Sequence, residues 1–262
     1  MDIEHIKQMG IRAVFRGGEA LKRHFGKLTA IRKKGIIDLV TEADVESERI
    51  IIETLKTAFP DHSILAEESG SMEGRQDERW IIDPLDGTTN FAHGLSIFAV
   101  SLAFFHQGTP TVGIVFNPLT AELFTAVRNQ GAWLNDQAIQ VSHVSTVRES
   151  LLVTGFPYNL EKITSSLMHR FQKCLPAAQG VRRLGSAALD LCYVACGRFE
   201  GFWEENLKPW DTAAGMLIAQ ESGGCVTDFS GQPYDVEKLQ ILATNGHIHA
   251  EMLTLLNIED HR

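Results

Sequence analysis

The chain has few cysteines, no excess of basic residues and no long apolar run. Its four cysteines in 262 residues are too few and too scattered for a disulfide framework. With 24 Lys or Arg against 33 Asp or Glu, the formal net charge is −9, which argues against nucleic-acid binding through a broad basic face. No stretch reaches the roughly 18 uninterrupted apolar residues that a membrane span needs. We therefore expect no membrane and no direct nucleic-acid partner.

The composition is otherwise that of an ordinary globular protein. Apolar types make up 44% and charged types 22% of the residues, which excludes a disordered tail, a collagen-like repeat and a coiled coil. The first ten residues carry charges at Asp2, Glu4 and Lys7, so they lack the apolar stretch of a signal peptide. These features predict a cytoplasmic protein.

The hydrophobic pattern divides the chain near residue 145. Residues 1–145 are expected to form an α+β unit, in which two helices precede several β-rich runs joined by the short turns of antiparallel strands. Residues 146–262 alternate between strand-like and helix-like segments, which is typical of an α/β unit with layered helices and strands. The predicted fold class is thus α+β followed by α/β.

The most informative segment is IIDPLDGTTN, residues 81–90. A buried strand brings Asp83 to its carboxyl end, and a turn at Asp86 leads into the expected start of a helix, where a phosphate can bind. The two carboxylates can converge with the Leu85 carbonyl on one point. Hard oxygen ligands of this kind suit Mg²⁺ or Mn²⁺ better than zinc.

The alternative is an ordinary Asp-Gly turn with both acids on the surface. Two further features favour a metal site. Glu67 and Glu68 end another apolar strand, and Asp211 opens a helix with several small residues. Acids at the ends of elements are common, but their repeated occurrence in a chain without Cys or His clusters is better explained by a metal site.

Five segments, in order along the chain, resemble the signature motifs of the inositol monophosphatase family of Mg²⁺-dependent, lithium-sensitive phosphatases. They are DLVTEAD at 38–44, AEES at 66–69, DPLDGTTN at 83–90, RRLGSAALD at 182–190 and WDTAAG at 210–215. The resemblance spans nearly the whole chain. It implies a layered α-β-α-β-α sandwich of the inositol monophosphatase and fructose-1,6-bisphosphatase type, a homodimer, and a site between the two halves.

The resemblance also assigns ligands to metal ions. Glu67, Asp83 and the Leu85 carbonyl resemble the ligands of a first Mg²⁺, for which Mn²⁺ is a possible substitute. Asp83, Asp86 and Asp211 resemble those of a second, so that Asp83 would bridge the two. A third, weaker ion would touch Glu67, largely through water, and Glu67 is also one of the expected catalytic residues. The ions are needed because carboxylates alone would repel a phosphate dianion.

The remaining catalytic roles also come from the resemblance. Asp44 and Thr88 look like the pair that orients and deprotonates the attacking water, and the backbone at Gly87 and Thr88 would hold the phosphate. The first metal would lower the pKa of its bound water, and the second would stabilise the leaving alkoxide. In-line attack on phosphorus needs little beyond positioning and electrostatics, so no Ser, Cys or His nucleophile is required.

Further substrate contacts follow by the same resemblance. They are Gly185, Ser186, Ala187, Glu204 and Asp211. Glu204 matches the position that contacts inositol hydroxyls, although the adjacent Glu205 competes for this role. The chain departs from some family members at Lys208, where they carry His, and this puts contacts with the ring in doubt rather than the chemistry.

These matches predict Mg²⁺-dependent hydrolysis of a small phosphorylated polyol or sugar, with inositol 1-phosphate favoured. Fructose 1,6-bisphosphate and histidinol phosphate remain alternatives, because related enzymes share the same acids. An added role in binding the transcription machinery is an alternative of another class, since some bacterial family members have it and Arg182-Arg183 precedes the shared loop.

Overall fold

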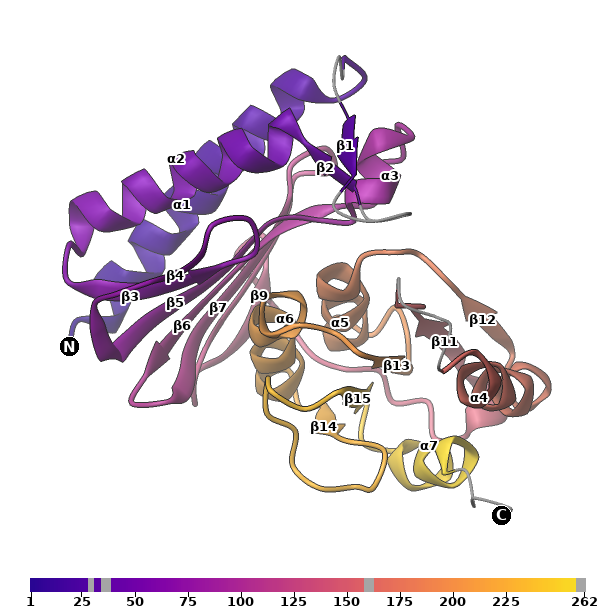
Figure 1. Cartoon of the computed structure of the whole chain (residues 1–262). Helices are drawn as coiled ribbons and strands as arrows, with labels where there is room; N and C mark the ends of the chain where they lie inside the picture. Colours follow the sequence, from indigo (N-terminus) through magenta and orange to yellow (C-terminus); the bar gives the residue numbers. More distant parts are fainter. Residues whose placement is uncertain (28–30, 34–38, 158–162, 258–262) are drawn as a thin grey trace.

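Helices and sheets alternate in five layers (Figure 1). The computed structural model describes residues 1–27, 31–33, 39–157 and 163–257. The layers are helices α1 (Ile3–His24) and α2 (Glu42–Ala58), an eight-stranded sheet, helices α5 (Ala187–Ala195) and α6 (Pro209–Glu221), a five-stranded sheet, and helices α4 (Thr164–Ala177) and α7 (His249–Leu256). This order is that of the α-β-α-β-α sandwich expected from the sequence, and the expectation is confirmed.

The first sheet brings two acidic segments together. Its order is β10-β9-β8-β7-β6-β5-β3-β4, and every neighbouring pair is antiparallel except β3 and β5. The strands are β3 (His62–Ala66), β4 (Gly70–Met72), β5 (Arg75–Asp86), β6 (Ala99–His106), β7 (Thr109–Asn117), β8 (Glu122–Val127), β9 (Gly131–Leu134) and β10 (Gln137–Ile139). Since β3 and β5 are parallel and Ala66 pairs with Ile82, Glu67 and Asp83 leave the paired strands at the same level.

The second sheet has the order β12-β11-β13-β15-β14. Its strands are β11 (Leu151–Thr154), β12 (Gly180–Arg182), β13 (Gly201–Glu205), β14 (Cys225–Thr227) and β15 (Gln240–Thr244). Strands β12, β11 and β13 are parallel, whereas β15 runs antiparallel to both of its neighbours. Thr154 pairs with Trp203, so the carboxyl ends of β11 and β13 also lie side by side.

The short elements complete the chain. Strands β1 (Ile31–Lys33) and β2 (Leu39–Thr41) form an antiparallel pair before α2. Helix α3 (Thr88–Ala92) follows β5 directly, and one turn of 3₁₀ helix (Val147–Glu149) precedes β11. Within the described part of the chain, no helix combines the length and the apolar character needed to cross a bilayer.

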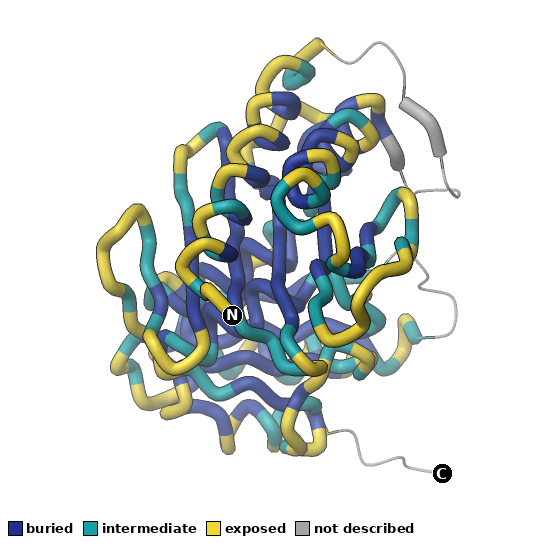
Figure 2. Tube along the Cα trace, turned by 90° about the vertical axis from the view of Figure 1, so that its left-hand side faces the viewer, coloured by how far each residue is buried: buried dark blue, intermediate teal, exposed yellow. Residues whose placement is uncertain are grey.

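The position of each helix explains its sequence. Helix α1 buries Ile6, Val14 and Leu21 against the first sheet and leaves its other face in solvent, which gives the alternation of dark blue and yellow along the outer helices in Figure 2. Helix α6 lies between the two sheets and is buried along the whole stretch from Thr212 to Ala219. A helix covered on both sides needs no polar face.

The predicted boundary near residue 145 stays a prediction. Helices α5 and α6 follow that point in the chain, yet they pack against the first sheet as well as the second, in one continuous apolar cluster. Several element boundaries differ from the sequence-based expectation. The residues at 182–184 predict a strand, but the strand there, β12, ends at Arg182, and β4 and β10 have three residues each, which is too short for a periodic hydrophobic signal.

Candidate active site

A cavity of about 770 Å³ is lined by residues from both sheets and from the helices between them. The predicted site residues on its wall are Glu67, Asp86, Gly87, Gly185, Ser186, Ala187, Glu204 and Asp211. The other predicted residues, Asp44, Asp83, Leu85 and Thr88, are buried next to this wall. The structure therefore brings all the predicted site residues into one region.

Asp83 is the most deeply placed of the acids at the first sheet. Its side chain is 2% exposed, and its Oδ1 accepts a hydrogen bond of 2.9 Å from the Leu85 N–H. Burial raises the pKa of Asp83 well above its usual value, and repulsion by Glu67, Asp86 and Asp211 adds to the effect. Three other acids thus lie close enough for their charges to act on this carboxyl.

Asp86 connects the first sheet to helix α5. Its Oδ2 accepts hydrogen bonds from the Ser186 hydroxyl and, at 2.8 Å, from the Ala188 N–H. Burial raises the pKa of Asp86 to about 6, although these hydrogen bonds and the charge of Arg183 act in the opposite direction. Ser186 is the N-cap of α5, so one serine both begins that helix and orients this acid.

Asp211 reaches the cavity from the first turn of α6. Its Oδ2 accepts a 2.6 Å hydrogen bond from the Lys208 N–H, and Pro209 follows at the start of the helix, where proline is favoured. The sequence departure at Lys208 therefore lies on the cavity wall, beside an acid that the resemblance assigns to a metal.

The donor set fits a hard divalent cation. Carboxylates dominate it, and Arg183 is the cation whose charge lowers the pKa of Asp86 and of Glu204. Such a concentration of buried like charge is costly unless a cation compensates it. Among the described residues, however, no group of three or more His, Cys, Asp or Glu side chains forms a ready-made metal site. Ion binding would therefore require the acids, several of which accept hydrogen bonds from the protein, to converge further.

The two oxygens of Asp44 have different partners. Oδ2 accepts hydrogen bonds from the Thr41 N–H and the Thr41 hydroxyl. The bond from the N–H is one half of the capping box that begins α2, and a backbone N–H that donates to the Thr41 hydroxyl supplies the other half. Oδ1 lies 3.2 Å from the Thr88 hydroxyl, which also lies 3.0 Å from the Leu85 carbonyl. Burial raises the pKa of Asp44 to about 6, although the two hydrogen bonds from Thr41 act to lower it. The capping role and the contact with Thr88 are therefore compatible.

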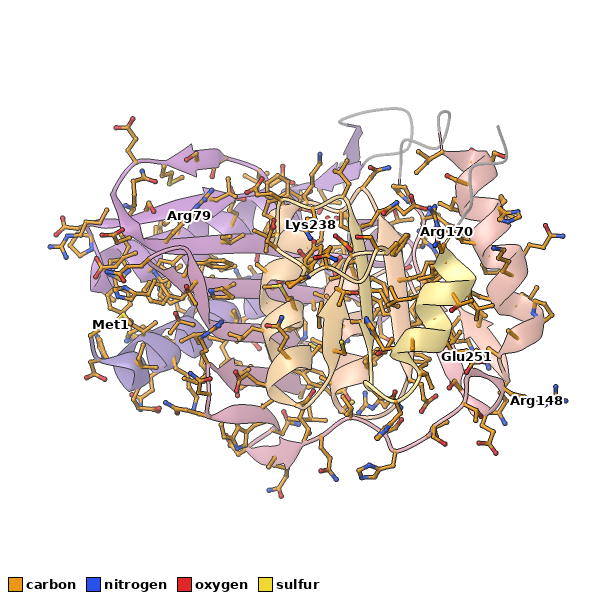
Figure 3. The ribbon with its side chains drawn as sticks, turned by 90° about the horizontal axis from the view of Figure 1, so that it is seen from below. Met1, Arg79, Arg148, Arg170, Lys238 and Glu251 are labelled. Atoms are coloured by element: carbon orange, nitrogen blue, oxygen red, sulfur yellow. The ribbon has the colours of Figure 1, made fainter. Side chains whose placement is uncertain are left out.

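Glu204 and Glu205 point to opposite faces of β13, as neighbours on a strand must. Glu204 lines the cavity, and burial raises its pKa well above the usual value, with repulsion from Asp211 and Asp86 adding to this. Glu205 instead forms a buried ion pair with Arg170, 2.5 Å apart, toward the outer helices. Figure 3 labels Arg170 beside α7, whose Leu256 carbonyl accepts from it at 2.9 Å.

The sequence did not reveal the part that several residues play around the cavity. Asn90 donates from Nδ2 to the Ile97 carbonyl at 2.7 Å and to the Leu184 carbonyl at 2.8 Å, which ties α3 to the loop before α5. Gly155 and Arg183 line the cavity beside Glu204. Asn90 and Arg183 lie inside recognised motifs, but the pattern carried no signal for their contacts, and Gly155 lies in none of the motifs.

Solved structures share this layered architecture over nearly the whole chain. The extragenic suppressor protein suhB from Bartonella henselae matches with a TM-score of 0.93 and 39% identity, covering 97% of this chain and 98% of that one. An inositol monophosphatase from Anabaena matches with a TM-score of 0.89 and 39% identity, covering 98% and 96%. The fold is thus that of inositol monophosphatase and SuhB structures.

The sequence comparisons identify the family. The model of the inositol monophosphatase family matches residues 2–260. An inositol-1-monophosphatase from Synechocystis sp. is 47% identical over 254 residues, which are 96% of this chain and 88% of the relative. The Nus factor SuhB of Haemophilus influenzae is 42% identical, covering 94% and 93%. The chain belongs to the inositol monophosphatase family and is an enzyme of the phosphatase type, and this family is generally metal-dependent.

Proposed function

We propose that this protein hydrolyses a phosphate monoester with the help of Mg²⁺, and that inositol 1-phosphate is its preferred substrate. The observation that carries the proposal is the group of acids, Glu67, Asp83 and Asp86, at one edge of the first sheet, with Asp211 across from them. Most of these acids line a cavity of about 770 Å³, which is the size of a small-molecule site.

Two ions would share this group of acids. Glu67, Asp83 and the Leu85 carbonyl would hold one, while Asp83, Asp86 and Asp211 would hold the other, with Mn²⁺ as a possible substitute for Mg²⁺. Glu67 would also touch a third, weaker ion through water. When bound, divalent ions supply a lowered water pKa and stabilise the charge that develops on a leaving alkoxide. The Ser186 hydroxyl orients Asp86 and the Leu85 N–H orients Asp83, and these two acids would then face the ions rather than one another.

Asp44 and Thr88 would position the attacking water. The Thr88 hydroxyl lies between Asp44 Oδ1 and the Leu85 carbonyl, so it can donate to the carboxylate and accept a hydrogen bond from water. As the water attacks, it would pass a proton to the Thr88 hydroxyl while Thr88 passes its own proton to Asp44. Because Thr41 holds the other oxygen of this carboxylate, Asp44 keeps its orientation without help from the substrate.

The opposite wall would bind the rest of the ester. Glu204 and Asp211 would accept hydrogen bonds from ring hydroxyls, and the backbone of Gly185, Ser186 and Ala187 would lie along the ring. The backbone at Gly87 and Thr88 would hold the phosphate. The choice of Glu204 over Glu205 is supported by the ion pair that holds Glu205 on the other face of its strand.

The test is phosphate release from a panel of inositol, fructose, histidinol and nucleotide phosphates, each with Mg²⁺ and after treatment with EDTA. We expect inositol 1-phosphate to be turned over best and every activity to disappear on chelation. Full turnover in EDTA would contradict the metal proposal. Faster phosphate release from fructose 1,6-bisphosphate or histidinol phosphate would contradict the proposed substrate but not the proposed chemistry.

We also propose a cytoplasmic homodimer that lithium inhibits. A small monovalent ion can occupy the second ion site without matching its charge, so inhibition should follow lithium concentration in the assay above. Light scattering on the purified protein measures its mass in solution. A monomeric mass would contradict the dimer proposal.

A second role is favoured by the relatives named Nus factor SuhB. In this role the protein would also bind the transcription machinery, with Arg182 and Arg183 as candidate contacts, since both are exposed. Arg183 also lines the cavity, whereas Arg182 does not, so Arg182→Ala is the cleaner variant. Loss of co-purifying RNA polymerase with unchanged phosphatase activity would support the role, and absence of the polymerase from the unaltered protein would contradict it.

A further inference from the structure

The Glu204 carboxylate occupies the space above Gly155. These two residues follow one another across the second sheet, because Thr154 pairs with Trp203 and both strands run in the same direction. The Thr154 hydroxyl donates to the Trp203 carbonyl at 2.7 Å, which holds the strands together at this level. Gly155 and Glu204 therefore emerge together at the wall of the cavity.

Space, and not backbone conformation, makes glycine necessary at position 155. Gly155 is not among the residues with a positive φ, so its φ does not call for glycine. A Cβ at this position would lie 1.9 Å from Glu204 Oε2 and 2.2 Å from Glu204 Cδ. At every other described glycine the nearest atom would be 2.5 Å away or more. A methyl group here would have to displace the carboxylate, since interiors are close-packed.

The displaced carboxylate would have no favourable place nearby. Asp211 and Asp86 repel Glu204, and Glu204 in turn repels Asp190. Asp190 is 1% exposed, and neither oxygen of its carboxyl has a hydrogen-bond partner within the described residues. Arg183 supplies the opposing charge, but it lies at the exposed side of the cavity. A shifted Glu204 would therefore move toward like charge or into the space for the substrate.

We propose that Gly155 is a positioning residue that sets the preference for polyol esters, because its missing side chain holds open the space in which the Glu204 carboxylate lies. This inference rests on the proposed function, in which Glu204 accepts hydrogen bonds from hydroxyls of the leaving group. Gly155 itself touches neither the phosphate nor the attacking water in this scheme. Its effect should appear in the choice of ester and depend on Glu204.

The experiment is a double-mutant cycle with Gly155→Ala and Glu204→Ala. For each protein, kcat/KM is measured for inositol 1-phosphate and for p-nitrophenyl phosphate, which has no hydroxyls on its leaving group. We expect Gly155→Ala alone to lower the ratio of the two values about tenfold or more. In the Glu204→Ala background, where the methyl group has room, Gly155→Ala should leave the ratio unchanged.

Gly180→Ala is the matched control. Gly180 lies in the same sheet with no positive φ, and its nearest neighbours would be the ends of flexible side chains at 3.2 Å and 3.3 Å. This variant should keep both activities. Melting temperatures of the four proteins of the cycle give a second readout. Gly155→Ala should lower the melting temperature less in the Glu204→Ala background than in the unaltered protein.

The outcomes separate the inference from the function on which it rests. An unchanged ratio in Gly155→Ala, or an equal loss with and without Glu204, overturns the positioning role. Melting temperatures that show no coupling between the two positions overturn the packing argument. If the unaltered protein itself does not prefer inositol 1-phosphate to the aryl ester, the proposed substrate fails, and the melting-temperature cycle still decides whether the two residues compete for space.

Discussion

The two walls of the cavity are built in different ways. The acidic wall comes mainly from the paired ends of β3 and β5, so that Glu67, Asp83 and Asp86 lie within one stretch of twenty residues. The opposite wall combines residues from separate segments, among them Gly155, Arg183 and Glu204. Local geometry fixes the first wall, whereas the second depends on how β11, β13 and α5 pack together.

The charges of the two walls differ as well. On the acidic wall burial and the charges of Glu67, Asp86 and Asp211 raise the pKa of Asp83, which is the situation that a bound cation relieves. On the other wall Arg183 partly offsets the charge of Glu204 and of the buried Asp190. If the proposed function is right, damage to the acidic wall should stop turnover of every ester, while damage to the other wall should change which esters are preferred.

The largest effect is expected from Asp83→Asn. Asp83 belongs to both proposed ion sites, so kcat should fall by about 10⁴-fold or more on all esters alike. The same change removes one of four mutually repelling acids, and the metal-free protein should therefore melt at a higher temperature. Turnover and melting in EDTA, measured on one preparation, check both parts. An effect confined to inositol esters would contradict the division between the walls.

Asp44→Asn tests the proposed base without touching a proposed ion ligand. Asparagine keeps the shape but cannot take the proton from water, so kcat should fall by about 10²–10⁴-fold while Mg²⁺ affinity changes far less. The pKa of Asp44 is about 6, so kcat/KM of the unaltered protein should decline as the pH falls below about 6. This decline should be absent from the variant.

Stability gives a second readout for Asp44. Its pKa is about 6 in the folded protein and 3.8 as the ordinary value, so the folded state holds the proton more tightly. Ionisation of Asp44 therefore lowers the free energy of unfolding as the pH rises from about 4 to about 6, and the variant should lack this contribution. Near-normal kcat with altered stability alone would reduce Asp44 to the cap of α2.

The third effect concerns the other wall and compares two adjacent acids. Glu204→Gln should lower kcat/KM for inositol 1-phosphate by about 5–150-fold relative to an aryl phosphate, since an unsatisfied buried polar group costs ~1–3 kcal/mol. Glu205→Gln is the control, because it disrupts the ion pair with Arg170 and should lower the melting temperature without changing this ratio. Equal losses on both esters in Glu204→Gln would make Glu204 structural.

The acidic wall could be predicted from the sequence because its residues follow recognisable strand ends. The segment around Asp83 combines a buried strand, a turn and a helix start, and the structure has these three elements in the same order as β5, the turn at Gly87 and α3. Gly87 has a φ of +93°, as a turn glycine should. Thr41 and Asp44 likewise have the residue types and the spacing of a capping box, and the structure has one at the start of α2.

The other wall could not be predicted in the same detail. Nothing in the sequence near Gly155 reveals that Glu204, 49 positions later, occupies the space where a side chain at position 155 would lie. This contact depends on the register between β11 and β13. The choice between Glu204 and Glu205 depended on which face of β13 each occupies, and a shift of one residue would have exchanged them. The partner of Glu205, Arg170, lies on a helix whose contacts the pattern did not reveal.

The smallest effect is expected at Ser186, where the two walls meet. Its hydroxyl donates to Asp86 on one wall and accepts from the Leu189 N–H at the start of α5 on the other. Ser186→Ala should weaken Mg²⁺ binding about tenfold, as the loss of a group that orients a ligand commonly does. It should also remove a cap worth ~1 kcal/mol, which corresponds to about 2–4 °C in Tm for a protein of this size.

Ser186→Thr keeps the hydroxyl and serves as the control. Because the proposed contact of Ser186 with the ring is made by its backbone, the preference among esters should change little. Unaltered Mg²⁺ affinity in the alanine variant would show that Asp86 is oriented without Ser186, and a large change in ester preference would show that the walls are not separable at this position.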